Sequence, residues 1–294
     1  MSPGLAYALI AFTIWGLFPL YLRQLASLSA LEILLHRSVW SLPVVLALMG
    51  LAGRLGFLRS AFGNRRQLSV FVLSAALLAV NWFVYLLAVQ GGRVLDASLG
   101  YFINPLVNVL LGVLVLRERL NRVQWLAVAP AAAAVIWLTA STGSLPWYAL
   151  ALAASFGLYG LVRKLAPAGA LEGLAVETLV LAPVMVPALL WWLATRPSAF
   201  DPPDPVVVAW VLASGPLTAL PLLAFAAAAR RLRLATLGLV QYLAPSLQFV
   251  LGVWVFAEPL QPARLAGFAL IWLALVIYSV DAWRRLAPRA AAAA

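Results

Sequence analysis

Ten stretches of apolar residues, each about 20 residues long, follow one another along this sequence and restrict the folds open to it. A helix needs about 20 predominantly apolar residues to cross the hydrocarbon core of a bilayer. The stretches are continuously apolar and do not alternate as the strands of a membrane barrel do. We therefore predict an all-α membrane protein with ten transmembrane helices. The predicted helices cover residues 4–22, 30–52, 68–90, 94–116, 122–140, 145–164, 172–194, 206–229, 234–256 and 263–283.

The composition agrees with a chain that has lipid as its solvent. Hydrophobic residues make up 65% of it and charged residues only 10%, whereas a soluble domain carries roughly 25% charged residues. The net charge of +11 raises the question of nucleic acid. The arginines, however, lie in short clusters between apolar stretches and form no continuous basic face, so we exclude a nucleic-acid partner. The expected partners are the lipid bilayer and a small-molecule substrate.

Basic residues are concentrated in alternate loops between the predicted helices. Cytoplasmic loops of membrane proteins carry an excess of Lys and Arg, so we expect these loops, and with them both chain termini, on the cytoplasmic side of a bacterial inner membrane. The alternate loops and the C-terminal tail hold Arg54, Arg59, Arg65, Arg66, Arg117, Arg119, Arg122, Arg163, Lys164, Arg230, Arg231, Arg233, Arg284, Arg285 and Arg289. The opposite loops hold Arg23, Arg93, Arg196 and Arg264.

The sequence also matches itself at a shift of 140 residues. Chance pairing of Leu and Ala is the alternative in so apolar a chain, but it does not account for paired Pro, Gly and Glu. We predict two five-helix repeats, residues 1–143 and 144–294. Because five is odd, the second repeat enters the membrane from the opposite side, an arrangement widespread among secondary transporters. The matches include Ala30-Leu31-Glu32 with Ala170-Leu171-Glu172, Pro105 with Pro245, Gly112 with Gly252 and Glu118 with Glu258.

Several charged residues lie inside or at the ends of predicted helices, where an unpaired charge is costly. Arg37 stands in the second helix beside His36 and Glu32, which share a helix face. It reaches the outer interface or pairs with Asp96 or Glu32, or it serves the substrate or a gate. At the repeat shift, Arg37 aligns with Glu177 of the seventh predicted helix. The candidate gating or charge-pairing residues are therefore Glu32, His36, Arg37, Asp96 and Glu177.

Polar and aromatic residues form stripes on the first, third, fourth and ninth predicted helices. Tyr101, Asn104 and Asn108 are spaced three and four residues apart, which places them on one helix face. Amides also hold membrane helices together, and Trp and Tyr often mark the membrane interface, so packing is the competing interpretation. We favour the lining of a cavity for an amphipathic solute. The candidate cavity residues are Trp15, Asn81, Trp82, Tyr85, Tyr101, Asn104, Gln241 and Tyr242.

The sequence offers little for catalysis or metal binding. It contains no cysteine and one histidine, and it lacks a phosphate-binding lysine loop, a nucleophile elbow, zinc-ligand spacing and a dinucleotide glycine fingerprint. Glu32 with His36 is the one candidate reactive pair, and it has no third orienting group. We therefore expect no enzyme, no metal and no cofactor.

Four segments carry a resemblance to a known family. They are Trp15-Gly16-Leu17-Phe18-Pro19-Leu20-Tyr21, the stretch from Leu31-Glu32 to His36-Arg37, the run from Leu95 to Leu106, and Leu116-Arg117-Glu118-Arg119-Leu120. With them the chain resembles the RarD branch of EamA-type carriers in the drug/metabolite transporter superfamily over nearly its whole length. The second half departs from the pattern, with Ala244 in place of Asn104 and Ala257 in place of Arg117.

The resemblance implies ten helices in an inverted repeat around a central cavity, lined mainly by the first, third, fourth, sixth, eighth and ninth helices. It also implies movement of small metabolites; related members move amino acids, and the branch name is linked to chloramphenicol sensitivity. We predict a secondary transporter for amino-acid-like or amphipathic drug-like solutes that works by alternating access in the export direction, with a coupling proton or ion as a candidate partner. The alternative is a membrane receptor or scaffold that binds a ligand without moving it.

Overall fold

The computed structural model describes residues 2–90, 94–142 and 147–257, and most of the residues from 262 to 281. Over this part the chain is helical and contains no β-strand, which confirms an all-α membrane protein. The helices are α1 (Pro3–Gln24), α2 (Ala30–Leu51), α3 (Gly56–Gly63), α4 (Arg65–Gln90), α5 (Val94–Leu114), α6 (Arg122–Thr142), α7 (Trp147–Leu165), α8 (Ala170–Thr195), α9 (Pro205–Arg231), α10 (Leu234–Gln241) and α11 (Leu243–Trp254).

The first eight predicted spans each correspond to one long helix, from α1 and α2 through α4–α9. The ninth is divided into α10 and α11, and the described residues in the region of the tenth are helical. Among the described residues, six helical stretches are long and apolar enough to cross a membrane, judged by length and composition. The chain is thus a multi-pass membrane protein, and the count of ten spans stays a prediction.

Local sequence signals fix several helix ends. The hydroxyls of Ser2 and Ser29 accept hydrogen bonds from backbone N–H groups of the first turns of α1 and α2, and Asp204 caps α9 in the same way. Such side chains satisfy amide groups that have no partner within the helix. The division between α10 and α11 follows from Pro245, which has no N–H group to donate to the carbonyl of Gln241 four residues earlier.

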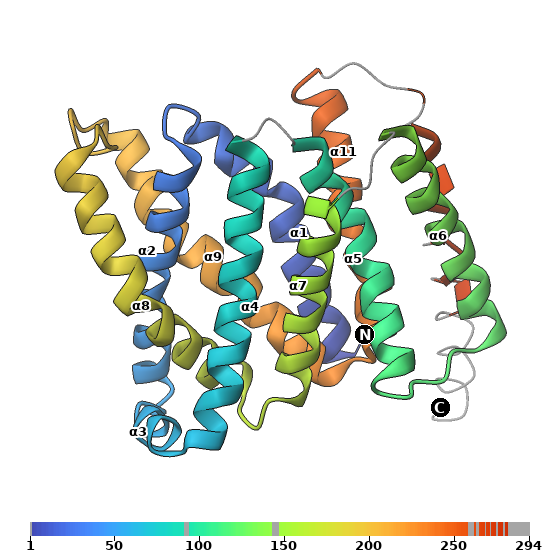
Figure 1. Ribbon diagram of the computed structural model, residues 1–294, viewed down its shortest axis with the longest axis horizontal. Helices are drawn as coiled ribbons and strands as arrows, with labels where there is room; N and C mark the ends of the chain where they lie inside the picture. The colour runs from blue at the N-terminus through green and yellow to red at the C-terminus, as the bar shows by residue number, and fades with distance from the viewer. Residues whose placement is uncertain are drawn as a thin grey trace, which may run out of the picture.

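The long helices run between two ends of the molecule (Figure 1). The α1–α2 and α8–α9 loops lie at the upper end of this view, whereas α3 and the α5–α6 loop lie at the lower end. Helix α1 packs against α9 and α11, α2 against α8 and α9, α4 against α7, and α5 against α7 and α10. The helices of the first half therefore pack largely against those of the second half, and the interior lies between the halves.

The starts of α2 and α8 make reciprocal contacts. Both helices begin with Ala-Leu-Glu. Glu32 at the start of α2 accepts a hydrogen bond of 2.8 Å from the backbone N–H of Ala199 in the α8–α9 loop. Glu172 at the start of α8 forms an ion pair with Arg54 in the α2–α3 loop. The start of α2 thus contacts the loop that follows α8, and the start of α8 contacts the loop that follows α2.

The ends of α5 and α11 are built alike. In α5, the N–H groups of Val115 and Leu116 both donate to the carbonyl of Leu111, and the corresponding bonds recur at the end of α11 on the carbonyl of Leu251. Each helix is then followed by a non-glycine residue in the left-handed region, Arg117 with φ 54° and Ala257 with φ 51°. These residues are 140 positions apart, the shift of the sequence repeat.

Candidate functional site

A cavity of about 590 Å³ lies between the two halves of the protein, within the usual size range of small-molecule sites. Its walls come from α1, α2, α4 and α5 on one side and from α7, α9, α10 and α11 on the other. It extends from the α1–α2 loop, where Leu25 and Leu28 line it, to Gln241 at the end of α10. The site is therefore a deep pocket that reaches one end of the helical bundle.

Seven of the predicted cavity residues line this pocket, namely Trp15, Asn81, Trp82, Tyr85, Tyr101, Asn104 and Gln241. The eighth, Tyr242, does not. It is fully buried, and its hydroxyl donates to the carbonyl of Phe102 at 3.1 Å. Neighbouring residues of a helix point about 100° apart, so Gln241 and Tyr242 face different surroundings. The role of the seven residues in binding a substrate stays a prediction.

Side-chain amides join the walls of the cavity. Asn104 donates to the carbonyl of Ala153 in α7 at 2.8 Å, and Asn108 donates to Gln241 in α10 at 2.9 Å. Asn81 in α4 donates to the carbonyl of Leu152 in α7 at 3.0 Å. Asn108 is fully buried and lies outside the lining, so packing is its role here. Asn81, Asn104 and Gln241 both pack and face the cavity.

Aromatic rings supply much of the remaining wall. Trp15 and Phe156 meet edge to face with their ring centroids 5.6 Å apart. The rings of Tyr85 and Tyr101 lie 6.4 Å apart, and neither hydroxyl has a hydrogen-bond partner among the described residues. The surface thus combines broad apolar contact with two phenols that remain available to a ligand.

Arg37 lines the same cavity. Its Nε–H donates to the hydroxyl of Thr218 in α9 at 3.1 Å, and its guanidinium carbon lies 4.6 Å from the ring centroid of Phe18. The predicted pairing with Glu32 is not formed, because that carboxylate contacts the α8–α9 loop instead. The side chain of Asp96, the other proposed partner, lies outside the described residues. Arg37 therefore stands at the cavity wall.

Glu32 and His36 lie outside the cavity lining and serve the α8–α9 loop. The indole N–H of Trp40 donates to Nδ1 of His36 at 3.2 Å, and the imidazole meets the ring of Phe200 edge to face. His36 Nε2 lies 3.8 Å from Glu32 Oε1. Both side chains are buried, so they fix the position of the loop at this end of the molecule.

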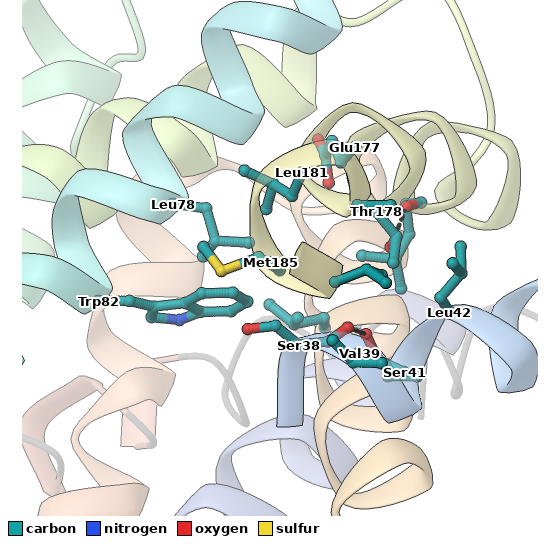
Figure 2. Close-up of a pocket in the computed structure, with 15 residues that line it drawn as sticks. Ser38, Val39, Ser41, Leu42, Leu78, Trp82, Glu177, Thr178, Leu181 and Met185 are labelled. Carbon is teal, nitrogen blue, oxygen red and sulfur yellow. Dashed lines mark hydrogen bonds between the residues drawn. The ribbon is translucent and has the colours of Figure 1, made fainter. Parts of the chain in front are cut away.

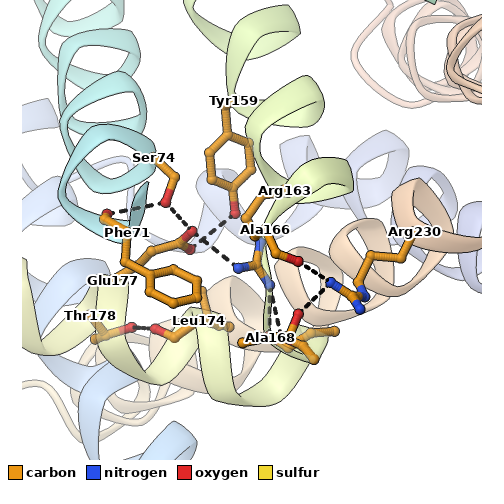
Figure 3. A network of polar contacts seen from close by, with 12 residues as sticks. Phe71, Ser74, Tyr159, Arg163, Ala166, Ala168, Leu174, Glu177, Thr178 and Arg230 are labelled. Atoms are coloured by element: carbon orange, nitrogen blue, oxygen red, sulfur yellow. Dashed lines mark hydrogen bonds and ion pairs between the residues drawn. The ribbon is translucent and has the colours of Figure 1, made fainter. Parts of the chain in front are cut away.

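Glu177 takes part in a buried polar network near the start of α8 (Figure 3). Its carboxylate accepts hydrogen bonds from the hydroxyls of Ser74 at 2.5 Å and Tyr159 at 3.3 Å, and lies 3.4 Å from Nη1 of Arg163. Arg163 is fully buried and also donates to the carbonyl of Ala170 at 3.0 Å. The network ties together α4, α7 and α8 at the end of the molecule opposite the α1–α2 loop.

The burial of Arg163 in α7 was not predicted, because the pattern of basic residues assigns it to a loop. The available signal was Gly173, one helical turn before Glu177. A Cβ atom at this glycine would lie 1.8 Å from Nη1 of Arg163. The glycine therefore leaves the space that the guanidinium occupies. A glycine one turn before a buried acid is the pattern that could have indicated a buried basic partner.

A hollow of about 20 Å³ lies between α2, α4, α8 and α9, with Glu177 and Thr178 in its wall (Figure 2). It has room for about one water molecule. Leu78, Trp82 and Leu222 line both this hollow and the large cavity. These three side chains therefore form the partition between the cavity and the hollow that Glu177 lines.

Comparisons with known proteins agree with this architecture. Residues 2–140 match the EamA-like transporter family. An uncharacterized transporter of Pseudomonas aeruginosa is 47% identical over 289 residues, which are 96% of this chain and 95% of the relative. Protein RarD of Streptomyces exfoliatus is 48% identical over 285 residues, 96% of this chain and 89% of the relative.

A crystal structure of another protein has the same fold. It superposes with a TM-score of 0.74 at 22% identity and covers 96% of this chain and 98% of its own. The sequence matches extend over nearly the full length of the chain, and the relatives are named as transporters or as RarD proteins. The chain therefore belongs to the EamA-like transporter family, in its RarD branch.

Proposed function

We propose that the protein is a secondary transporter that moves small metabolites out of the cell by alternating access. The observation that carries the proposal is the cavity of about 590 Å³ whose walls come from both halves of the chain. A site between two such halves is exposed to each side of the membrane in turn when one half rocks against the other. The aromatic and amide lining suits amino-acid-like or amphipathic drug-like solutes.

An inverted duplication, with repeats at 1–143 and 144–294, underlies the proposal. Three features support it: the reciprocal contacts of Glu32 and Glu172, the matching ends of α5 and α11, and the helix packing. A two-fold axis in the membrane plane that exchanges the halves would relate the contact of α1 with α9 to that of α7 with α4. It would also relate the contact of α5 with α7 to that of α11 with α1.

The two ends of the molecule differ in the way alternating access requires. The cavity reaches the end that carries the α1–α2 loop, whereas the network of Glu177 and Arg163 holds α4, α7 and α8 together at the other end. The basic loops predict that the second end faces the cytoplasm of a bacterium. The state described is then open outward and closed inward, with the Glu177 network as the cytoplasmic gate.

Reconstitution into proteoliposomes tests the proposal. We expect saturable flux for at least one member of a panel of amino acids and amphenicols, measured with and without a pH gradient to detect coupling to protons. Tyr85→Phe should lower the apparent affinity for a solute that uses the phenol by about fivefold, the value of one neutral hydrogen bond. Tyr7→Phe, on α1 outside the cavity lining, is the matched control.

Direction and mechanism can be separated in the same vesicles. Loading solute on the side of the termini and then on the opposite side compares export with uptake. Binding of a solute without flux of that same solute would contradict transport and favour a receptor or scaffold. Unchanged flux in folded Tyr85→Phe and Asn81→Ala would instead place the substrate outside this cavity.

A further inference from the structure

We propose that Arg37 binds the carboxylate of the transported solute, so that the cavity selects organic monoanions with an aromatic or apolar body over neutral and zwitterionic analogues. This inference rests on the proposed transport function and narrows its substrate class. It also departs from the amino-acid-like solutes expected above.

The described lining of the cavity carries a positive charge and no negative one. Arg37 is the one charged residue in the lining, within the part of the chain that the structure describes. The described acids near Arg37 have other partners, since Glu32 accepts from the α8–α9 loop and Glu177 pairs with Arg163. The side chain of Asp96 lies outside the described residues. A cation away from bulk water is costly unless a counter-charge meets it. An anionic ligand would supply this counter-charge.

The guanidinium of Arg37 is held in place with most of its donors unused. Thr218 accepts a hydrogen bond from Nε–H, and the guanidinium carbon lies over the ring of Phe18, 4.6 Å from its centroid. Neither Nη atom has a protein partner among the described residues. These atoms form the fork that binds the two oxygens of a carboxylate in parallel. Because both contacts fix the side chain before a ligand arrives, little rotamer entropy is lost on binding.

The groups around Arg37 favour an acid with an aromatic body. The phenols of Tyr85 and Tyr101 line the same cavity and are available to donate to a second acceptor. Trp15, Trp82 and Phe156 supply the apolar surface. A zwitterion would bring an ammonium group as well, and the described lining contains no carboxylate to pair with it. Its dehydration would therefore cost affinity.

Three ligands of nearly equal shape test this inference on the full-length protein in nanodiscs. They are 3-phenylpropanoate, 3-phenylpropanamide and phenylalanine, which at pH 7 are an anion, a neutral amide and a zwitterion. We expect calorimetry to show the anion bound about tenfold or more tightly than the other two, as a charge-assisted bidentate contact provides. Vesicle flux of the same compounds should follow the same order.

Variants of the site sharpen the test. Arg37→Gln should abolish the preference for the anion by weakening the binding of 3-phenylpropanoate to about the level of the amide. Thermal unfolding of the variant beside the unchanged protein shows whether it is folded. Thr218→Val, which releases Nε–H, should weaken the preference in part. Arg23→Gln is the matched control. Arg23, in the last turn of α1, lies near the same end of the molecule as Arg37 but contacts Phe256 outside the cavity.

The inference is overturned if the amide or phenylalanine binds as tightly as the anion, if none of the three binds, or if Arg37→Gln keeps the preference. These outcomes differ from failure of the proposed function. A protein that transports neutral or zwitterionic solutes would remain a transporter with a different selectivity. A protein that binds 3-phenylpropanoate through Arg37 without moving it would retain the anion site and lose the transport proposal.

Discussion

At the scale of single residues, the ion pair of Arg163 and Glu177 stands out by its burial. The side chains are 0% and 1% exposed. Glu177→Gln would leave a buried guanidinium without a counter-charge, and we expect it to lower the free energy of unfolding by about 3–5 kcal/mol. Arg163→Met combined with Glu177→Gln should cost less than the sum of the two single changes. Reversible unfolding in mixed detergent micelles measures each value.

The pair of Arg54 and Glu172 provides the control. Its arginine is 56% exposed, so water and salt screen the attraction, and Glu172→Gln should cost less than about 1 kcal/mol. Equal losses in Glu177→Gln and Glu172→Gln would contradict the account of the buried network.

Single residues also show where reasoning from sequence succeeds. Asn81, Tyr85 and Asn104 could be placed in a cavity because polar groups inside apolar stretches must face something other than lipid. Tyr242 could not be assigned, since its surroundings depend on how α10 turns against α5. The burial of Arg163 depends on the approach of α8, a contact between segments that hydropathy does not describe.

At the scale of helices, the ends of α5 and α11 are strained in the same way. Side chains other than glycine meet a steric cost in the left-handed region, and glycine does not. We expect Ala257→Gly, at φ 51°, to raise the free energy of unfolding by about 1 kcal/mol. Ala52→Gly makes the same change at the end of α2, where φ is −80°, and should lower it slightly. Thermal unfolding of the two purified variants measures the difference, and shifts of the same sign would contradict it.

Helix boundaries could be predicted well because lipid imposes both length and composition on a span. The start of α2 was predicted at residue 30, where the helix begins. The short α3 was not predicted, because the residues that form it are too few and too mixed to stand out. The division of the ninth span at Tyr242 was not predicted, because the sequence alone does not tell whether Pro245 divides the helix or bends it.

At the scale of the whole molecule, the proposed orientation makes a direct prediction. The chain contains no cysteine, so a single introduced thiol reports the side on which it lies. Ser27→Cys, in the α1–α2 loop, should react with a membrane-impermeant maleimide in intact cells. Ser60→Cys, in α3 at the other end of α2, should react only after the membrane is opened. The reverse pattern would place the cavity mouth toward the cytoplasm.

The contacts of Glu32 and Glu172, at the starts of α2 and α8, differ in how far water reaches them. Glu32 accepts a hydrogen bond from a buried peptide N–H, whereas Glu172 pairs with a guanidinium that is largely exposed to water. Dissolved ions weaken an attraction between exposed charges and hardly affect a buried hydrogen bond. Raising the ionic strength should therefore weaken the contact between Arg54 and Glu172 and leave the contact between Glu32 and Ala199 intact.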